Sequence, residues 1–243
     1  MLLHGGGANA HWWDHIAPTF ADQFHVVALD FRGHGDSERP EELIPGAFNE
    51  DLEAILRDLG HQPATLVGHS MGANVALAYA ATHSLRCLVL VDPARGGTAR
   101  NRRRMRLALT LRQSSPSREE AIERFRFLPD AETTSESLRL SIARHSVEPG
   151  PDGRWRYKFD SRWFGLPGSR KPDVTAVSCP VLVMRGEQSG VLSAEAAVEL
   201  AESFTDGECA EIQGAGHHLQ LDQPEAFIAS LRHFLARHSP SRP

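Results

Sequence analysis

The sequence contains few cysteines and no long apolar run. Its 243 residues include three cysteines, and each lies in or beside a strand-like segment: Cys87, Cys179 and Cys209. An odd number without paired spacing predicts reduced core thiols and argues against a disulfide framework or a cysteine-based metal site. No apolar run approaches the roughly 20 residues that span a bilayer, and no charged segment followed by an apolar one opens the chain. We therefore expect a cytoplasmic protein without a membrane partner.

The chain also lacks the usual signatures of nucleic-acid, nucleotide and metal binding. The net charge of -5 gives no reason to expect nucleic acid or an anionic membrane as a partner. No Gly-x-Gly-x-x-Gly follows a strand, and there is no Walker loop. His11 and His15 have the i, i+4 spacing of a metal-binding pair, but no third ligand accompanies them, which favours a solvated helix face. The sequence therefore predicts no metal and no cofactor.

The apolar runs that are present alternate with helical patterns along the chain. Apolar residues make up 41% of the sequence and charged residues 23%, as in ordinary globular proteins. Strand-like runs lie at 1–4, 26–30, 64–67, 87–92, 181–184 and 208–212. Because these strands are apolar throughout, we expect a doubly wound, mostly parallel α/β sheet of about six strands, covered by helices on both faces.

Between residues 94 and 171 this alternation stops. Strand-like runs disappear, short helical segments carry many arginines, and aromatic residues gather between 155 and 164. The pattern predicts a helical cap insertion at 94–171 over the carboxyl edge of the sheet, in a core domain made of 1–93 and 172–243. The arginine run at 100–106 favours a solvated face, with binding of an acidic substrate as the alternative.

The most informative stretch is Gly68-His69-Ser70-Met71-Gly72, which lies between an apolar run and an Ala-rich helical stretch. A serine in a tight turn from strand to helix has a strained backbone, and glycines on both sides let the two segments pass closely. The free N–H groups of the following helix lie beside the hydroxyl and can stabilise an oxyanion. This context favours a nucleophilic Ser70 over a turn without chemistry.

Other reactive residues fall at the carboxyl ends of the predicted strands, where ligands bind in such sheets. They are the glycine run Gly5 to Gly7, Asp92, and His217. Acyl transfer needs a hydroxyl nucleophile, an imidazole to take its proton, a carboxylate to orient the ring and N–H donors for the oxyanion. The chain offers a candidate for each requirement.

These motifs resemble those of the α/β-hydrolases, in the lipase- and esterase-like superfamily, over nearly the whole chain. The matching residues are His4-Gly5-Gly6-Gly7, Asp30-Phe31-Arg32-Gly33-His34-Gly35-Asp36-Ser37, Gly68-His69-Ser70-Met71-Gly72 and Gly214-Ala215-Gly216-His217. The resemblance implies that Ser70 is the nucleophile and His217, rather than His218, the general base. It also implies an oxyanion hole formed by the N–H groups of Gly6 and Met71.

The chain departs from the family pattern in two places. Ser189 stands where the family usually carries its acid, so the acid is expected to be Asp92, after the preceding strand, with Glu187 as the alternative. The two strands that normally precede the first one here are absent, which leaves the strand at 26–30 as an edge with unpaired backbone groups. We expect either a misassigned start or an edge covered by association, so a homo-oligomer is possible.

The resemblance implies a serine hydrolase that cleaves an ester, lactone or similarly activated carbonyl of a small, fairly apolar molecule. A carbon–carbon bond hydrolase with the same triad is the first alternative, and basic residues of the cap would suit its acidic substrate. A non-catalytic ligand-binding protein is the second. Trp12 and Trp13 are expected to cover the substrate pocket or, equally, to fill the core.

Overall fold

The computed structural model describes residues 1–60, 63–94, 114–131, 133–165 and 172–238. The arginine run at 100–106 lies outside these ranges. Among the helices of the described ranges, none has both the length and the apolar character needed to cross a membrane.

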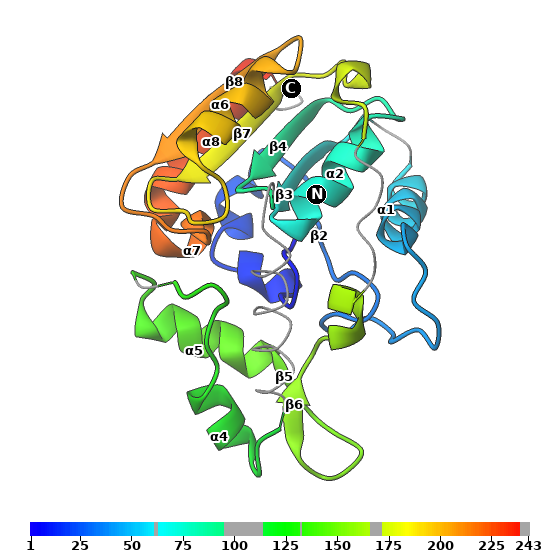
Figure 1. Cartoon of the computed structure of the whole chain (residues 1–243), viewed down its shortest axis with the longest axis vertical. Coiled ribbons are helices and arrows are strands. Elements are labelled where there is room, and N and C mark those ends of the chain that lie inside the picture. Colours follow the sequence, from blue (N-terminus) through cyan, green and yellow to red (C-terminus); the bar gives the residue numbers. More distant parts are fainter. Residues whose placement is uncertain (61–62, 95–113, 132, 166–171, 239–243) are drawn as a thin grey trace.

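A six-stranded parallel sheet forms the centre of the molecule (Figure 1). In spatial order its strands are β2 (Ala28–Leu29), β1 (Leu2–Leu3), β3 (Thr65–His69), β4 (Cys87–Val91), β7 (Val181–Gly186) and β8 (Gly207–Ile212). The predicted parallel sheet is confirmed. The four strands β3, β4, β7 and β8 have five or six residues each, whereas β1 and β2 have two, and β2 forms one edge of the sheet.

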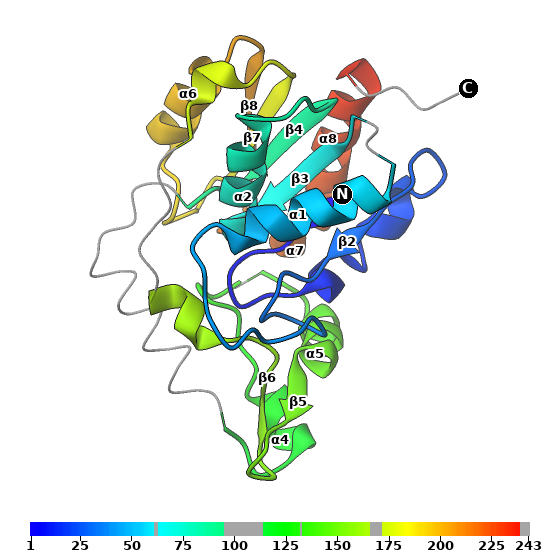
Figure 2. The same ribbon diagram turned by 90° about the vertical axis from the view of Figure 1, so that its right-hand side faces the viewer.

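Helices cover both faces of the sheet, as Figure 2 shows. Successive strand residues point to opposite faces, so Leu66 and Val67 belong to two different apolar clusters. One cluster packs against α1 (Ala47–Asp58), α2 (Met71–Ala80) and α6 (Ala194–Glu202). The other packs against η1 (Ala10–Trp13), η2 (Ala17–Phe20), α7 (Leu219–Asp222) and α8 (Pro224–His238). The doubly wound arrangement is therefore confirmed.

Residues 114–165, called the inserted segment below, lie beyond the carboxyl ends of the strands (Figure 1). The segment contains α4 (Arg118–Glu123), α5 (Glu136–His145), β5 (Val147–Pro149), β6 (Trp155–Tyr157) and η3 (Ser161–Gly165). The expectation that it contains no strands is wrong, because β5 and β6 form an antiparallel hairpin. Each has only three residues, too few to show an alternating pattern. The hairpin turn falls within 149–153, a stretch of two prolines, two glycines and an aspartate.

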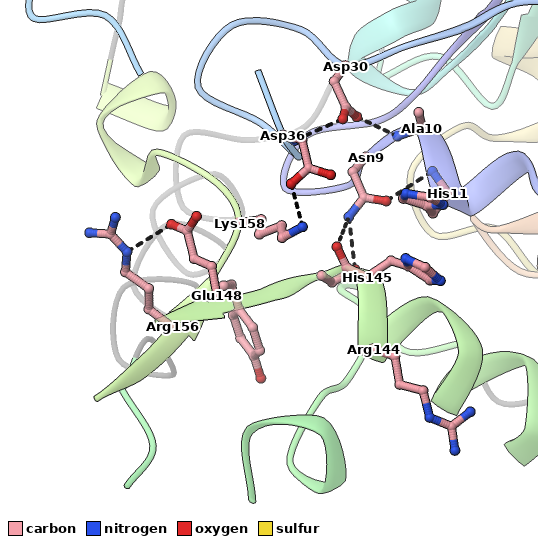
Figure 3. A network of polar contacts seen from close by, with 12 residues as sticks. Asn9, Ala10, His11, Asp30, Asp36, Arg144, His145, Glu148, Arg156 and Lys158 are labelled. Carbon is pink, nitrogen blue, oxygen red and sulfur yellow. Dashed lines mark hydrogen bonds and ion pairs between the residues drawn. The ribbon is translucent and has the colours of Figure 1, made fainter. Parts of the chain in front are cut away.

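Polar contacts join the inserted segment to the loops that follow β1 and β2 (Figure 3). The Asn9 amide donates to the Ser146 hydroxyl at 3.0 Å, and Lys158 pairs with Asp36. The loop bearing Asp36 is itself fixed, because the Asp30 carboxylate accepts hydrogen bonds from the backbone N–H groups of Ala10 and Asp36. The inserted segment is thus connected to backbone at the same edge of the sheet as the candidate site.

Below these contacts, His4 and His34 are buried, with ring centroids 5.0 Å apart. His4 Nε2 accepts a hydrogen bond from the Phe31 N–H, so Nδ1 carries the proton and donates to the Gly5 carbonyl at 2.7 Å. Burial lowers the pKa of His4. Burial also lowers the pKa of His34, and the neighbouring His4 ring lowers it further, to about 3. Both rings are therefore neutral near pH 7.

Acid should destabilise the fold through these histidines. In the unfolded chain His34 takes up a proton as the pH falls through about 6.5, whereas in the folded chain it stays neutral until about pH 3. Between pH 7 and pH 5 this difference lowers the free energy of unfolding by about 2 kcal/mol for such a group. Urea unfolding of His34→Phe should show a correspondingly smaller loss over this range. His25→Phe, at an exposed position, is the control, and an unchanged pH dependence in His34→Phe would contradict the argument.

Candidate active site

Ser70 lies in the turn between β3 and α2, with a backbone φ of 52° and ψ of -107°. A positive φ is strained for a residue with a side chain, and such strain persists only where surrounding contacts hold it. Here the Ser70 N–H donates to the Val91 carbonyl at 2.9 Å, and the Ser70 carbonyl accepts from the Asn74 N–H at 3.3 Å. The turn therefore holds a partly exposed serine at the N-terminus of a helix.

The turn requires glycine on both sides. A Cβ at Gly68 would collide with the carbonyl of Gly72, and a Cβ at Gly72 would lie 2.6 Å from the carbonyl oxygens of Leu3 and His4. These backbones approach one another more closely than any side chain permits. The predicted context of strand, tight turn and helix around Ser70 is present in the structure.

The structure brings His217 and Asp92 together. Asp92 follows β4, is completely buried and has a φ of 43°. His217 is 6% exposed, and its Nδ1 lies 2.8 Å from Asp92 Oδ1. Because a carboxylate accepts, Nδ1 carries the proton, and the lone pair of the ring is on Nε2. This arrangement orients an imidazole for general-base chemistry.

Glu187, the alternative acid, has a different partner. Its side chain is exposed, and Oε2 accepts a hydrogen bond from the Gly214 N–H at 2.9 Å. Ser189, two residues later, donates from its hydroxyl to Asp92 Oδ1 at 2.8 Å. The carboxylate in contact with His217 is thus Asp92. Glu187 stabilises the start of the loop at 213–218 between β8 and α7, called the histidine loop below.

Two further histidines surround His217. His69 Nε2 donates to the His217 carbonyl at 3.0 Å, and His218 Nε2 donates to the Pro129 carbonyl of the inserted segment at 2.9 Å. Burial, and the proximity of His217, lower the pKa of both rings well below the usual value. His69 and His218 are therefore neutral, and each N–H is bonded to a carbonyl. Of the two adjacent histidines, only His217 contacts a carboxylate.

Potential metal ligands meet in two places within the described ranges. One ring nitrogen each from His69, His217 and His218 lies within 4.8 Å of the others, but this group is part of the candidate catalytic arrangement. The second group joins His11 to Asp14 and His145. The solvated helix face favoured for His11 and His15 is wrong for His15, because this residue lies beyond the end of η1 and its Nε2 is 2.8 Å from the Gln220 carbonyl oxygen.

The glycine run after β1 passes beside Ser70. The Gly5 carbonyl accepts from His4 Nδ1 at 2.7 Å and from the Ala8 N–H at 3.2 Å, which fixes the path of the loop. Met71 is the first residue of α2, so its N–H has no partner within the helix. A Cβ at Gly6 would lie 3.8 Å from Met71 Sδ, so the two expected donors of the oxyanion hole come from adjoining segments.

The two tryptophans of η1 have different surroundings. The Trp12 ring contacts Phe127 and His218, with centroid distances of 5.1 and 5.4 Å, and so lies between the inserted segment and the histidine loop. Trp13 is 1% exposed and packs against Phe227 of α8. These positions favour core packing for Trp13 and leave Trp12 beside the candidate site.

Sequence reasoning did not find the roles of His69, Ser189 and Asp222 around this site. Asp222 accepts from the Gly216 N–H and from the Thr134 hydroxyl, both at 2.9 Å, and so connects the histidine loop to the inserted segment. His69 was visible only as the variable residue of the serine motif. No pattern in the sequence indicates these contacts, because most of the partners lie far away along the chain: His69 bonds to His217, Ser189 to Asp92 and Asp222 to Thr134.

Comparison with known proteins agrees with this geometry. Residues 1–224 match the family model of the alpha/beta hydrolase fold. The chain is 30% identical to an esterase of Mycobacterium tuberculosis, Rv0045c, over 96% of its own length and 80% of that protein. It is 25% identical to the 2-hydroxy-6-oxo-2,4-heptadienoate hydrolase of Pseudomonas putida, over 97% of its length and 88% of that protein.

Solved structures of similar fold include an E-2-(acetamidomethylene)succinate hydrolase. It has a TM-score of 0.83 and 23% identity, and the match covers 97% of this chain and 90% of that one. A structure of the M. tuberculosis esterase has a TM-score of 0.78 and 28% identity, with 97% and 84% covered. The parallel sheet, the strained serine turn and the family match together identify the chain as a hydrolase that belongs to the α/β-hydrolase fold family.

Proposed function

We propose that the protein is a serine hydrolase that cleaves an ester, lactone or similarly activated carbonyl of a small, fairly apolar molecule. The observation that carries this proposal is the His217–Asp92 hydrogen bond of 2.8 Å at the same sheet edge as the strained Ser70 turn. In this arrangement Ser70 is the nucleophile, His217 the general base and Asp92 the acid that orients the base.

The reaction begins when Ser70 Oγ attacks the substrate carbonyl and His217 Nε2 takes the hydroxyl proton. Asp92 accepts the hydrogen bond from the Nδ1–H throughout and stabilises the imidazolium that forms. His217 then gives the proton to the leaving group, which leaves an acyl-enzyme on Ser70. A water molecule, deprotonated by the same Nε2, cleaves this ester and restores the free serine.

The oxyanion of each tetrahedral intermediate would accept hydrogen bonds from the Gly6 and Met71 N–H groups. Fixed backbone donors stabilise developing charge without rearrangement, and loss of one donor costs about 3 kcal/mol in enzymes of this type. The positive end of the α2 dipole adds to this stabilisation.

The aromatic surroundings support a fairly apolar substrate. Phe164 of η3 is close to Gly6, since a Cβ there would lie 3.1 Å from the Phe164 ring. Trp12 packs edge to face against both Phe127 and His218. The inserted segment, acting as a cap, would present Phe127 and Phe164 to the substrate, and η1 would present Trp12.

Carbon–carbon bond hydrolysis is the second candidate, favoured by the similarity to the P. putida hydrolase along 97% of the chain. The same serine and histidine would act on a ketone carbonyl in place of an ester. Activity on a vinylogous diketone acid, with no turnover of simple esters, would select this alternative.

Replacement of Ser70 by Ala should abolish hydrolysis of p-nitrophenyl esters, from acetate to octanoate. Without the nucleophile the rate should fall by more than about 10⁴-fold, since only binding and oxyanion stabilisation remain. A fluorophosphonate probe should label the wild-type protein and not Ser70→Ala. Absence of label on the folded wild type would instead favour a ligand-binding protein without catalysis.

Asp92→Asn and Glu187→Gln form a matched pair that tests the acid. Asn at position 92 favours the wrong tautomer of His217, so kcat should fall by about 10³–10⁴-fold. Glu187→Gln should stay within about twofold of the wild type, since its side chain is exposed and contacts only the Gly214 N–H. The reverse pattern in steady-state kinetics would assign the acid to Glu187.

A further inference from the structure

The Asp92 carboxylate has three hydrogen-bond donors. Oδ1 accepts from His217 Nδ1 and from the Ser189 hydroxyl, each at 2.8 Å, and Oδ2 accepts from the Gly186 N–H at 3.2 Å. Two of the three donors come from the end of β7 and the loop that follows it. Asp92 follows β4, and it is thus held by donors from the neighbouring strand β7 and its loop.

The Ser189 hydroxyl is itself fixed in direction. Its oxygen accepts hydrogen bonds from the N–H groups of Val191 and Leu192, at 3.1 and 3.3 Å. The Ser189 N–H donates to the Gly186 carbonyl at 3.0 Å, which closes the turn. With its lone pairs occupied by two amides, the hydroxyl has its single proton left for Asp92.

We propose that Ser189 is a positioning residue for the catalytic pair, which holds Asp92 Oδ1 in line with His217 Nδ1. The inference rests on the proposed function and adds a fourth side chain to it. Without Ser189, the oxygen that faces His217 would have the histidine as its sole donor, and the histidine must change charge in every turnover. Ser189 is a donor whose charge does not change, so it keeps the carboxylate in place through the cycle.

The side chain at position 189 therefore ends close to the place where Asp92 Oδ1 meets His217. Since Ser189 Oγ lies 2.8 Å from the oxygen that bonds to His217, a carboxylate carried at position 189 should be able to reach Nδ1 itself. We expect that Ser189→Asp restores part of the activity lost in Asp92→Asn.

A double-mutant cycle tests the positioning role. Ser189→Ala should lower kcat by about tenfold, with KM within about twofold, because a hydrogen bond to a charged group is lost. In the Asp92→Asn background the same substitution should lower kcat by less than about twofold. Ser193→Ala is the control. The Ser193 hydroxyl caps α6 by accepting from the Ala196 N–H at 3.2 Å, so its loss should leave kcat unchanged. An equal loss from Ser189→Ala in both backgrounds would overturn the proposal.

The exchange of acids gives the second test. Asp92→Asn/Ser189→Asp should be at least about tenfold more active than Asp92→Asn alone. If the double variant is folded, as judged by circular dichroism, and no more active than Asp92→Asn, a carboxylate at position 189 does not reach His217 Nδ1 and the inference is wrong.

A measurement without turnover separates this inference from the proposed function. The Hδ1 proton of His217 should give a downfield NMR signal in Ser70→Ala, which keeps the pair intact and cannot react. Adding Ser189→Ala should shift this signal, and adding Ser193→Ala should not. An unshifted signal overturns the role of Ser189, whether or not any ester is hydrolysed, whereas a shift in a protein without esterase activity supports it and counts only against the proposed substrate.

Discussion

His217 reaches Asp92 because the loop after β8 crosses over the end of β7. Asp92 follows β4 and His217 lies in the loop after β8. These two strands are not neighbours, because β7 lies between them. At the crossing point a Cβ on Gly186 would collide with the carbonyl of Gly216 and lie 2.5 Å from that of Ala215. The missing side chain lets the loop through, and the Gly186 N–H also bonds to Asp92. The pairing of His217 with Asp92 depends on this one glycine.

Backbone contact sets the rest of the site in the same way. Gly68 and Gly72 bring β3, α2 and the end of β1 together around Ser70. The histidines that surround this framework are hydrogen-bonded to carbonyls: His4 to Gly5, His69 to His217 and His218 to Pro129. Since burial lowers the pKa of all three, these rings are neutral. They fix the backbone of the site through hydrogen bonds and add no charge to it. In the proposed mechanism a single ring of the group takes up a proton.

The sheet could be predicted from the sequence because its central strands β3, β4 and β7 are buried on both faces and are therefore mostly apolar. The serine turn could be predicted because the glycine spacing has a steric cause. The hairpin β5–β6 could not, since strands of three residues carry too little pattern. The sequence could not decide between Asp92 and Glu187, because both lie at the carboxyl end of a strand at the correct edge of the sheet. The structure places Asp92 against His217, and its catalytic role stays a prediction.

The Ser189 contact illustrates why the remainder could not be predicted. Ser189 and Asp92 are separated by 97 positions, and a serine in a loop has many common functions in capping and turns. Its significance depends on which oxygen it meets, which is a matter of tertiary packing. The same holds for Asp222, whose partners Gly216 and Thr134 come from different parts of the chain.

The histidine loop is attached to the inserted segment through His218, which donates to the Pro129 carbonyl, and through Asp222, which bonds to Gly216 of the loop and accepts from the Thr133 and Thr134 hydroxyls. A change that repositions Pro129 or Thr134 therefore also acts on the loop that carries His217. In the proposed mechanism, a substitution that reshapes the inserted segment would therefore also move the general base. Substrate range and turnover would then be coupled, so that a substitution selected for one would change the other.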